Sequence, residues 1–165
     1  MERAGAARVL VAGIGNVFAT DDGFGPEVAR RLSERTRPVG VRVVDYGIRG
    51  MHLAYDLLDP WDALVLVDAV PDRGAVGAVA VLEIGPEHLR AGAQVDAHAM
   101  DPATVLATLG ALGGQLPPRT LLVGCQVADT GDGMGLSAPV EAAVGVAMDV
   151  VDGLLTRELR PGGVV

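Results

Sequence analysis

The stretch that most constrains the fold of this chain lies near its start and reads RVLVAGIGNVFATDDGFG, residues 8–25. It opens with an apolar run as short as a buried strand and continues into glycines and an asparagine, which tolerate tight or left-handed backbone. Pro26 follows, and apolar residues then recur at helical spacing, so a helix is expected to begin near Pro26. The stretch predicts a strand, a glycine loop carrying Asp21 and Asp22, and a helix. In open α/β sheets such a loop lies at the carboxyl end of its strand, where ligands bind.

A dinucleotide-binding loop is the first alternative for this stretch. Its fingerprint is G-x-G-x-x-G, and the last of these positions is Phe18 in this chain. The two carboxylates would also repel a phosphate, so this alternative is disfavoured. A second alternative is structural, because either acid could cap the helix or form an Asx turn. Of the pair, we expect Asp21 to serve the structure and Asp22 to face a cleft.

The rest of the chain predicts a three-layer α/β/α fold. Further strand candidates, separated largely by amphipathic helices, cover residues 39–45, 62–67, 75–84 and 120–124. They predict a mostly parallel, twisted sheet of five strands. The turn over 71–74 is too short for a parallel crossover, so the strand after it is expected to run antiparallel at an edge. No repeat or linker interrupts the pattern, and we expect one domain over residues 1–165.

Composition narrows the partners and the compartment. The formal net charge is -8, with no cluster of basic residues, which argues against nucleic acid or an anionic membrane as a partner. The single cysteine, Cys125, excludes an intramolecular disulfide and fits a reducing compartment. No apolar run approaches the ~20 residues that span a bilayer, and the first residues lack a signal-peptide core. We therefore expect a cytoplasmic protein, with Cys125 as an ordinary thiol.

Two further residues with useful chemistry follow predicted strands. Asp68 ends the apolar run of the third strand candidate, next to the strand that precedes Asp22. Its alternative role is a cap or loop anchor. His98 lies in a loop just before a helix that Asp101-Pro102 is expected to start. A loop histidine by itself is most often solvated.

Several of these segments resemble one known family. GIGNVFATDDGFG is similar to the opening motif of the hydrogenase maturation proteases, endopeptidases that trim the C-terminus of the large subunit of nickel-iron hydrogenases. The resemblance continues with Asp68 after an apolar run, with His98 ahead of a helix, and with GLSAPVEAAV, where Ser137 is expected to cap the last helix. It extends from Arg8 to about Leu155, and the order of these features makes it specific.

The resemblance implies a phosphorylase/hydrolase-like fold and a metal-dependent function. In the family, the residues matching Asp22, Asp68 and His98 bind a metal and govern cleavage. The implied metal is nickel, supplied by the large-subunit precursor rather than permanently bound. Two carboxylates and an imidazole suit a borderline divalent ion, and three protein ligands leave positions open for water or substrate.

The mechanism and two other function classes stay open at this point. The chain has no HExxH zinc motif and no G-x-S-x-G elbow, so the attacking water would be activated by the metal or by Asp22 and Asp68, as in an aspartyl-type protease. A nickel chaperone without peptidase activity would use the same three ligands. A nucleoside- or phosphate-handling enzyme on a similar sheet is less favoured, because the expected rim is acidic.

Overall fold

The computed structural model describes residues 5–85 and 102–159. Its strands are β1 (Val9–Ile14), β2 (Val41–Gly47), β3 (Ala63–Pro71), β4 (Val79–Glu83) and β5 (Arg119–Val127). Its helices are α1 (Phe24–Leu32), α2 (Gly50–Asp56), α4 (Pro102–Ala111) and α5 (Ala138–Gly153). A single 3₁₀ turn, η1 (Thr20–Gly23), precedes α1, and a π-helical turn, Leu154–Glu158, extends α5. His98 lies outside the described residues.

The five strands form one sheet in the order β2-β1-β3-β5-β4. The pairs β1–β2, β1–β3 and β3–β5 are parallel, and β4 pairs antiparallel with β5. The predicted mostly parallel sheet with an antiparallel edge strand is thereby confirmed. Because β1 and β3 are adjacent and parallel, the residues that follow them meet at one edge of the sheet, which we call the carboxyl edge.

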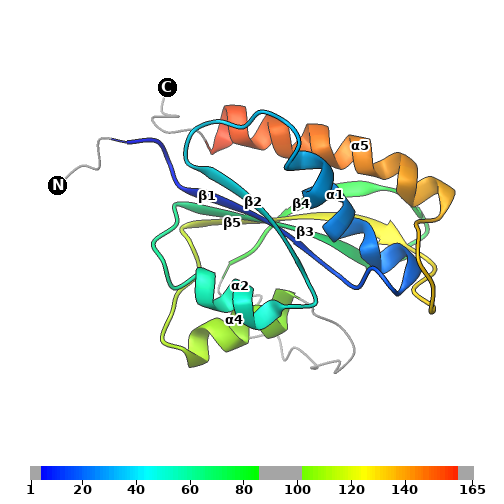
Figure 1. Ribbon diagram of the computed structural model, residues 1–165, viewed down its shortest axis with the longest axis horizontal. Coiled ribbons are helices and arrows are strands. Elements are labelled where there is room, and N and C mark those ends of the chain that lie inside the picture. The colour runs from blue at the N-terminus through cyan, green and yellow to red at the C-terminus, as the bar shows by residue number, and fades with distance from the viewer. Residues whose placement is uncertain (1–4, 86–101, 160–165) are drawn as a thin grey trace.

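Helices cover both faces of this sheet (Figure 1), as the predicted three layers require. Alternate residues of β1 point to opposite sides: Val9 and Val11 pack in the core under α1 and α5, whereas Leu10 and Ala12 pack toward α2 and α4. The first six residues of β3 are all buried, as expected for a central parallel strand. Within the described residues, no helix has the length and apolarity needed to cross a bilayer.

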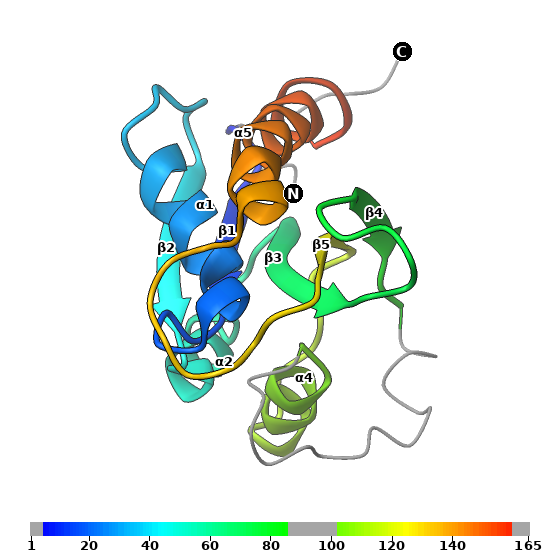
Figure 2. The ribbon, with the colours of Figure 1, turned by 90° about the vertical axis from the view of Figure 1, so that its right-hand side faces the viewer.

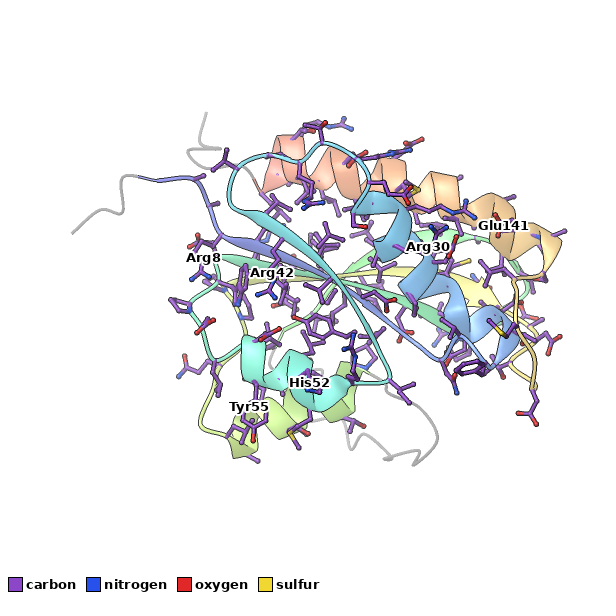
Figure 3. All side chains as sticks on the ribbon, viewed as in Figure 1. Arg8, Arg30, Arg42, His52, Tyr55 and Glu141 are labelled. Atoms are coloured by element: carbon purple, nitrogen blue, oxygen red, sulfur yellow. The ribbon has the colours of Figure 1, made fainter. Side chains whose placement is uncertain are left out.

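Ion pairs hold α1 against α5 on one side of the sheet. Arg31 of α1 bonds Glu27 on its own helix and Glu141 on α5. Figure 3 shows Arg30 of α1 and Glu141 of α5 where the two helices face each other. Arg35, just after α1, reaches Asp152 near the far end of α5 at 2.7 Å. The position of α1, and of the turn that precedes it, therefore depends on α5.

Several element boundaries differ from the sequence prediction by a few residues, and two of these differences have identifiable reasons. The first helix begins at Phe24 rather than near Pro26, because the η1 turn leads directly into it. The edge strand begins at Val79 rather than at residue 75. Gly77 adopts φ +92°, and a side chain there would lie 2.9 Å from the carbonyl oxygen of Pro139. The chain therefore turns beneath the start of α5 before it can join the sheet.

Candidate functional site

The carboxyl edge brings the loop after β1 against the end of β3. A Cβ atom on Gly25 would lie 2.3 Å from the carbonyl oxygens of both Ile14 and Val67, so the start of α1 rests directly on the ends of these two strands. The η1 turn is also in contact with β3. Asp22, in η1, and Asp68, in β3, consequently lie at the same edge of the sheet.

Asp22 is half-buried and held by the end of β1. Its Oδ2 accepts a hydrogen bond from the backbone N–H of Asn16 at 2.8 Å. Gly15 has φ +144°, and a Cβ there would lie 2.0 Å from the carbonyl oxygen of Asp22, so only glycine allows this approach. The motif glycines thus serve close packing of backbone on backbone. Within the described residues, only Oδ2 of the carboxylate that they position accepts a hydrogen bond.

Asp68 is 7% exposed and lies within β3, opposite Gly124 of β5. It is thus a carboxylate buried near the end of a central strand. His98, the third predicted ligand, falls outside the described residues. Within residues 5–85 and 102–159, no group of three or more metal-binding side chains comes together. The structure therefore brings two of the three predicted residues to one edge.

A pocket of about 240 Å³ opens beside Asp22 between the ends of β1 and β2. It is lined by residues 15–18 and 45–49. Arg49 shapes one wall, since its guanidinium donates to the carbonyl oxygens of Asp45 and Tyr46 at 2.8 and 3.2 Å. The pocket shares Asn16 with the Asp22 site, although Asp22 itself is not one of its lining residues. Sequence reasoning missed Arg49, because nothing in its local pattern marks it.

Comparison with known proteins identifies the family. A family model described as hydrogenase maturation protease matches residues 26–153. The chain belongs to the hydrogenase maturation protease family. The matched range holds Asp68 and His98 and begins just after the η1 turn that carries Asp22.

Similar proteins extend the hydrogenase maturation protease match over nearly the whole chain. The hydrogenase expression/formation protein HupD of Rhodobacter capsulatus is 34% identical over 159 residues, 95% of this chain and 73% of that protein. The hydrogenase 2 maturation protease of Escherichia coli K12 is 30% identical over 95% of this chain and 93% of its own length. The solved structure of the E. coli hydrogenase maturating endopeptidase HybD superposes with a TM-score of 0.71 at 29% identity, covering 87% of this chain and 89% of that one. The chain is accordingly an endopeptidase of this family.

Asp21 has the structural role predicted for it in this hydrogenase maturation protease. It is 1% exposed, and its two carboxylate oxygens accept the backbone N–H of Ser137 at 2.7 Å and the Ser137 hydroxyl at 2.8 Å. Ser137 occupies the N-cap position of α5 as expected, but its hydroxyl bonds Asp21 instead of the helix's own N–H groups. The Asp21 carboxylate thus binds the N-cap residue and lies near the positive end of the helix.

The sequence did not single out the left-handed non-glycine residue of the glycine loop. Among the described non-glycine residues only Thr20 has a positive φ, +47°, and Asn16, whose residue type tolerates such backbone, does not. Asn16 uses its side chain otherwise, since its Oδ1 accepts the backbone N–H of Phe18 at 2.9 Å. The hydroxyl of Thr20 donates to the carbonyl oxygen of Asp129 at 2.7 Å, a long-range contact that local sequence cannot reveal.

Cys125 has no features of a catalytic nucleophile in this protease. It is fully buried in the core under α5, and burial, followed by the nearby negative charge of Asp21, raises the pKa of its thiol to about 11. A nucleophilic cysteine needs a lowered pKa and access to substrate. The expectation of an ordinary thiol therefore holds.

Proposed function

We propose that this chain removes a C-terminal extension from the nickel-loaded large-subunit precursor of a nickel-iron hydrogenase. In this proposal Asp22, Asp68 and His98 recognise nickel that the precursor carries, and recognition permits cleavage. The precursor is then both partner and substrate, and the metal arrives as part of it. Family membership supports the reaction class, and similarity to the hydrogenase 2 maturation protease of E. coli supports the kind of substrate.

The observation that carries this proposal is the meeting of two carboxylates from different segments at one edge of the sheet. Carboxylate oxygens suit a hard or borderline divalent ion, and an imidazole from His98 would complete a mixed oxygen and nitrogen set. Asp22 is fixed by the Asn16 N–H, so it needs little reorganisation to act. The neighbouring pocket, which shares Asn16 with this site, offers room for part of a peptide.

The proposed chemistry is hydrolysis of one peptide bond by water. Asp22 or Asp68 would take the proton of the attacking water, with the nickel of the precursor as the other candidate activator. Both carboxylates lie at the carboxyl edge of the sheet, Asp22 half-buried in the η1 turn and Asp68 buried in β3. Cleavage would thus depend on the metal state of the substrate.

Single substitutions test the residue assignment. Asp22→Ala, Asp68→Ala and His98→Ala should each abolish trimming of a nickel-loaded precursor, followed by mass spectrometry, while circular dichroism keeps the parent spectrum. Asp62→Ala is the matched control, because Asp62 precedes the same strand as Asp68 but at its amino end, where it accepts the backbone N–H of Arg8 at 2.7 Å. Parent-like trimming by any of the three variants would remove that residue from the proposed site.

A further inference from the structure

The η1 turn that carries Asp22 is clamped by the loop that joins β5 to α5. Backbone hydrogen bonds run from the N–H of Thr20 to the oxygen of Gly133 at 2.9 Å, from the N–H of Asp21 to the oxygen of Asp129 at 3.0 Å, and from the N–H of Gly133 to the oxygen of Phe18 at 2.9 Å. Figure 2 shows this loop curving past the loop between β1 and α1. The two segments are more than a hundred residues apart in the sequence and form one unit in space.

The clamp holds backbone that would not adopt this shape unaided. Thr20 adopts φ +47°, a left-handed conformation that is unfavourable for a non-glycine residue. Its hydroxyl offsets part of that cost by donating to the carbonyl oxygen of Asp129. The deepest attachment is the Asp21 carboxylate, which accepts both Ser137 donors at the start of α5. Removing that carboxylate would leave two donors of Ser137 without their partner and the strained turn without its anchor.

Asp22 depends on this anchor because it is the next residue along the same turn. On one side its carboxylate and its carbonyl rest against Asn16 and Gly15 at the end of β1. On the other side its position is set by Asp21, which α5 holds. A shift of η1 away from α5 would therefore move the Asp22 carboxylate off the Asn16 N–H.

We infer that Asp21 is a positioning residue for Asp22: its buried carboxylate locks the η1 turn to the start of α5 and so fixes where the Asp22 carboxylate stands. This inference rests on the proposed function for the role of Asp22 in cleavage. It assigns Asp21 no contact with substrate or metal. It also makes the loop after β5 part of the machinery that aligns the site.

Three variants and one control test the inference. Asp21→Ala removes both acceptors, whereas Asp21→Asn keeps an oxygen for the Ser137 N–H and can donate to the Ser137 hydroxyl. Ser137→Ala removes the hydroxyl bond alone. Asp152→Ala is the matched control, since Asp152 also ties α5 to the α1 side through Arg35, but far from the carboxyl edge.

Two readouts separate positioning from general stability. The first is the rate of precursor trimming, normalised to the folded fraction at the assay temperature. We expect this rate to fall at least tenfold in Asp21→Ala and by less in Asp21→Asn and Ser137→Ala. In Asp152→Ala it should stay within twofold of the parent rate. The second is the Asn16 backbone amide in a nitrogen–proton correlation spectrum, because this N–H bonds Asp22. This amide resonance should shift in the spectrum of Asp21→Ala and keep its parent position in that of Asp152→Ala.

The same measurements distinguish failure of the inference from failure of the proposed function. Trimming by Asp22→Ala at the parent rate would defeat the proposed function. If Asp22→Ala is inactive, a folded Asp21→Ala that trims within twofold of the parent would overturn the positioning role alone. Loss of trimming by Asp21→Ala with an unshifted Asn16 amide resonance would also overturn the positioning role. If Asp21→Ala does not fold, Asp21→Asn and Ser137→Ala decide by the same two readouts.

Discussion

Two adjacent aspartates, Asp21 and Asp22, have opposite environments in this protein. Asp21 is buried and bonded by both donors of Ser137, whereas Asp22 is half-buried and bonded by one backbone N–H. The 3₁₀ geometry of η1 causes this division, because consecutive side chains in such a turn point about a third of a turn apart. The Asp21 side chain therefore faces α5, and the Asp22 side chain lies at the carboxyl edge of the sheet.

The raised pKa of Cys125 gives a prediction at the scale of one residue. With a pKa of about 11, only about one thiol in a thousand is ionised at pH 8. Iodoacetamide should therefore modify the folded protein far more slowly than the same chain in urea, as followed by mass. Cys125→Ala should trim the precursor within about twofold of the parent. Rapid labelling of the folded chain, with matching loss of activity, would contradict the burial argument.

The structural role of Asp21 was predictable from the sequence, but its partner was not. Its assignment to structure was confirmed by the two bonds that it accepts from Ser137. The left-handed Thr20 and the pocket residue Arg49 were missed. Thr20 bonds Asp129 in a distant loop, which local sequence does not show, and Arg49 bonds the backbone of nearby Asp45, a contact that no side-chain pattern marks. The roles of Asp22, Asp68 and His98 remain predictions.

At the scale of elements, the contact between α1 and the strand ends gives a sharp prediction. Gly25→Ala would place a Cβ 2.3 Å from two carbonyl oxygens, so it should lower the free energy of unfolding by about 2 kcal/mol or more. Gly145→Ala is the control, because the space around Gly145 in α5 is open and alanine favours a helix by up to about 1 kcal/mol. Urea midpoints at equal slope measure both changes. Equal midpoints for the two variants would show that α1 does not rest on the strands as described.

The ion pairs that Glu27 forms with Arg30 and Arg31 within α1 predict that stability depends on pH. Hydrogen bonds from Arg30, above all, lower the pKa of Glu27 from 4.5 to about 2. Since the folded pKa is the lower one, the stabilisation is complete above pH 4.5 and is lost as the pH falls toward 2. At pH 7, Glu27→Gln should therefore unfold with a free energy lower by on the order of 1 kcal/mol, after allowance for solvent screening.

The test of this pH dependence is the difference in the free energy of unfolding between the parent and Glu27→Gln, measured by urea titration at pH 7, 4 and 2.5. This difference should shrink steadily as the pH falls. Glu34→Gln serves as the control, because Glu34 is exposed and meets Arg30 only at 3.5 Å. A difference that stays constant on acidification would mean that the ion pairs of Glu27 with Arg30 and Arg31 do not stabilise the fold.

The layers and the mostly parallel sheet with one antiparallel strand were predictable from features that the sequence displays. The buried run of β3 and the short turn before β4 predicted a central parallel strand and an antiparallel edge, and both were confirmed. The predicted start of β4 was wrong. The observed start depends on the close approach of Gly77 to Pro139, and these two residues are far apart in the sequence. Local periodicity specifies elements, whereas contacts between elements decide where they begin and end.

At the same scale, the central proposal is that the metal state of the precursor controls cleavage. The most direct measurement compares nickel-loaded and nickel-free forms of one large-subunit precursor, each incubated with the parent chain and analysed by mass spectrometry. The account predicts that only the nickel-loaded form loses its C-terminal extension, and that Asp22→Ala leaves both forms intact. Equal trimming of the two forms by the parent chain would contradict it.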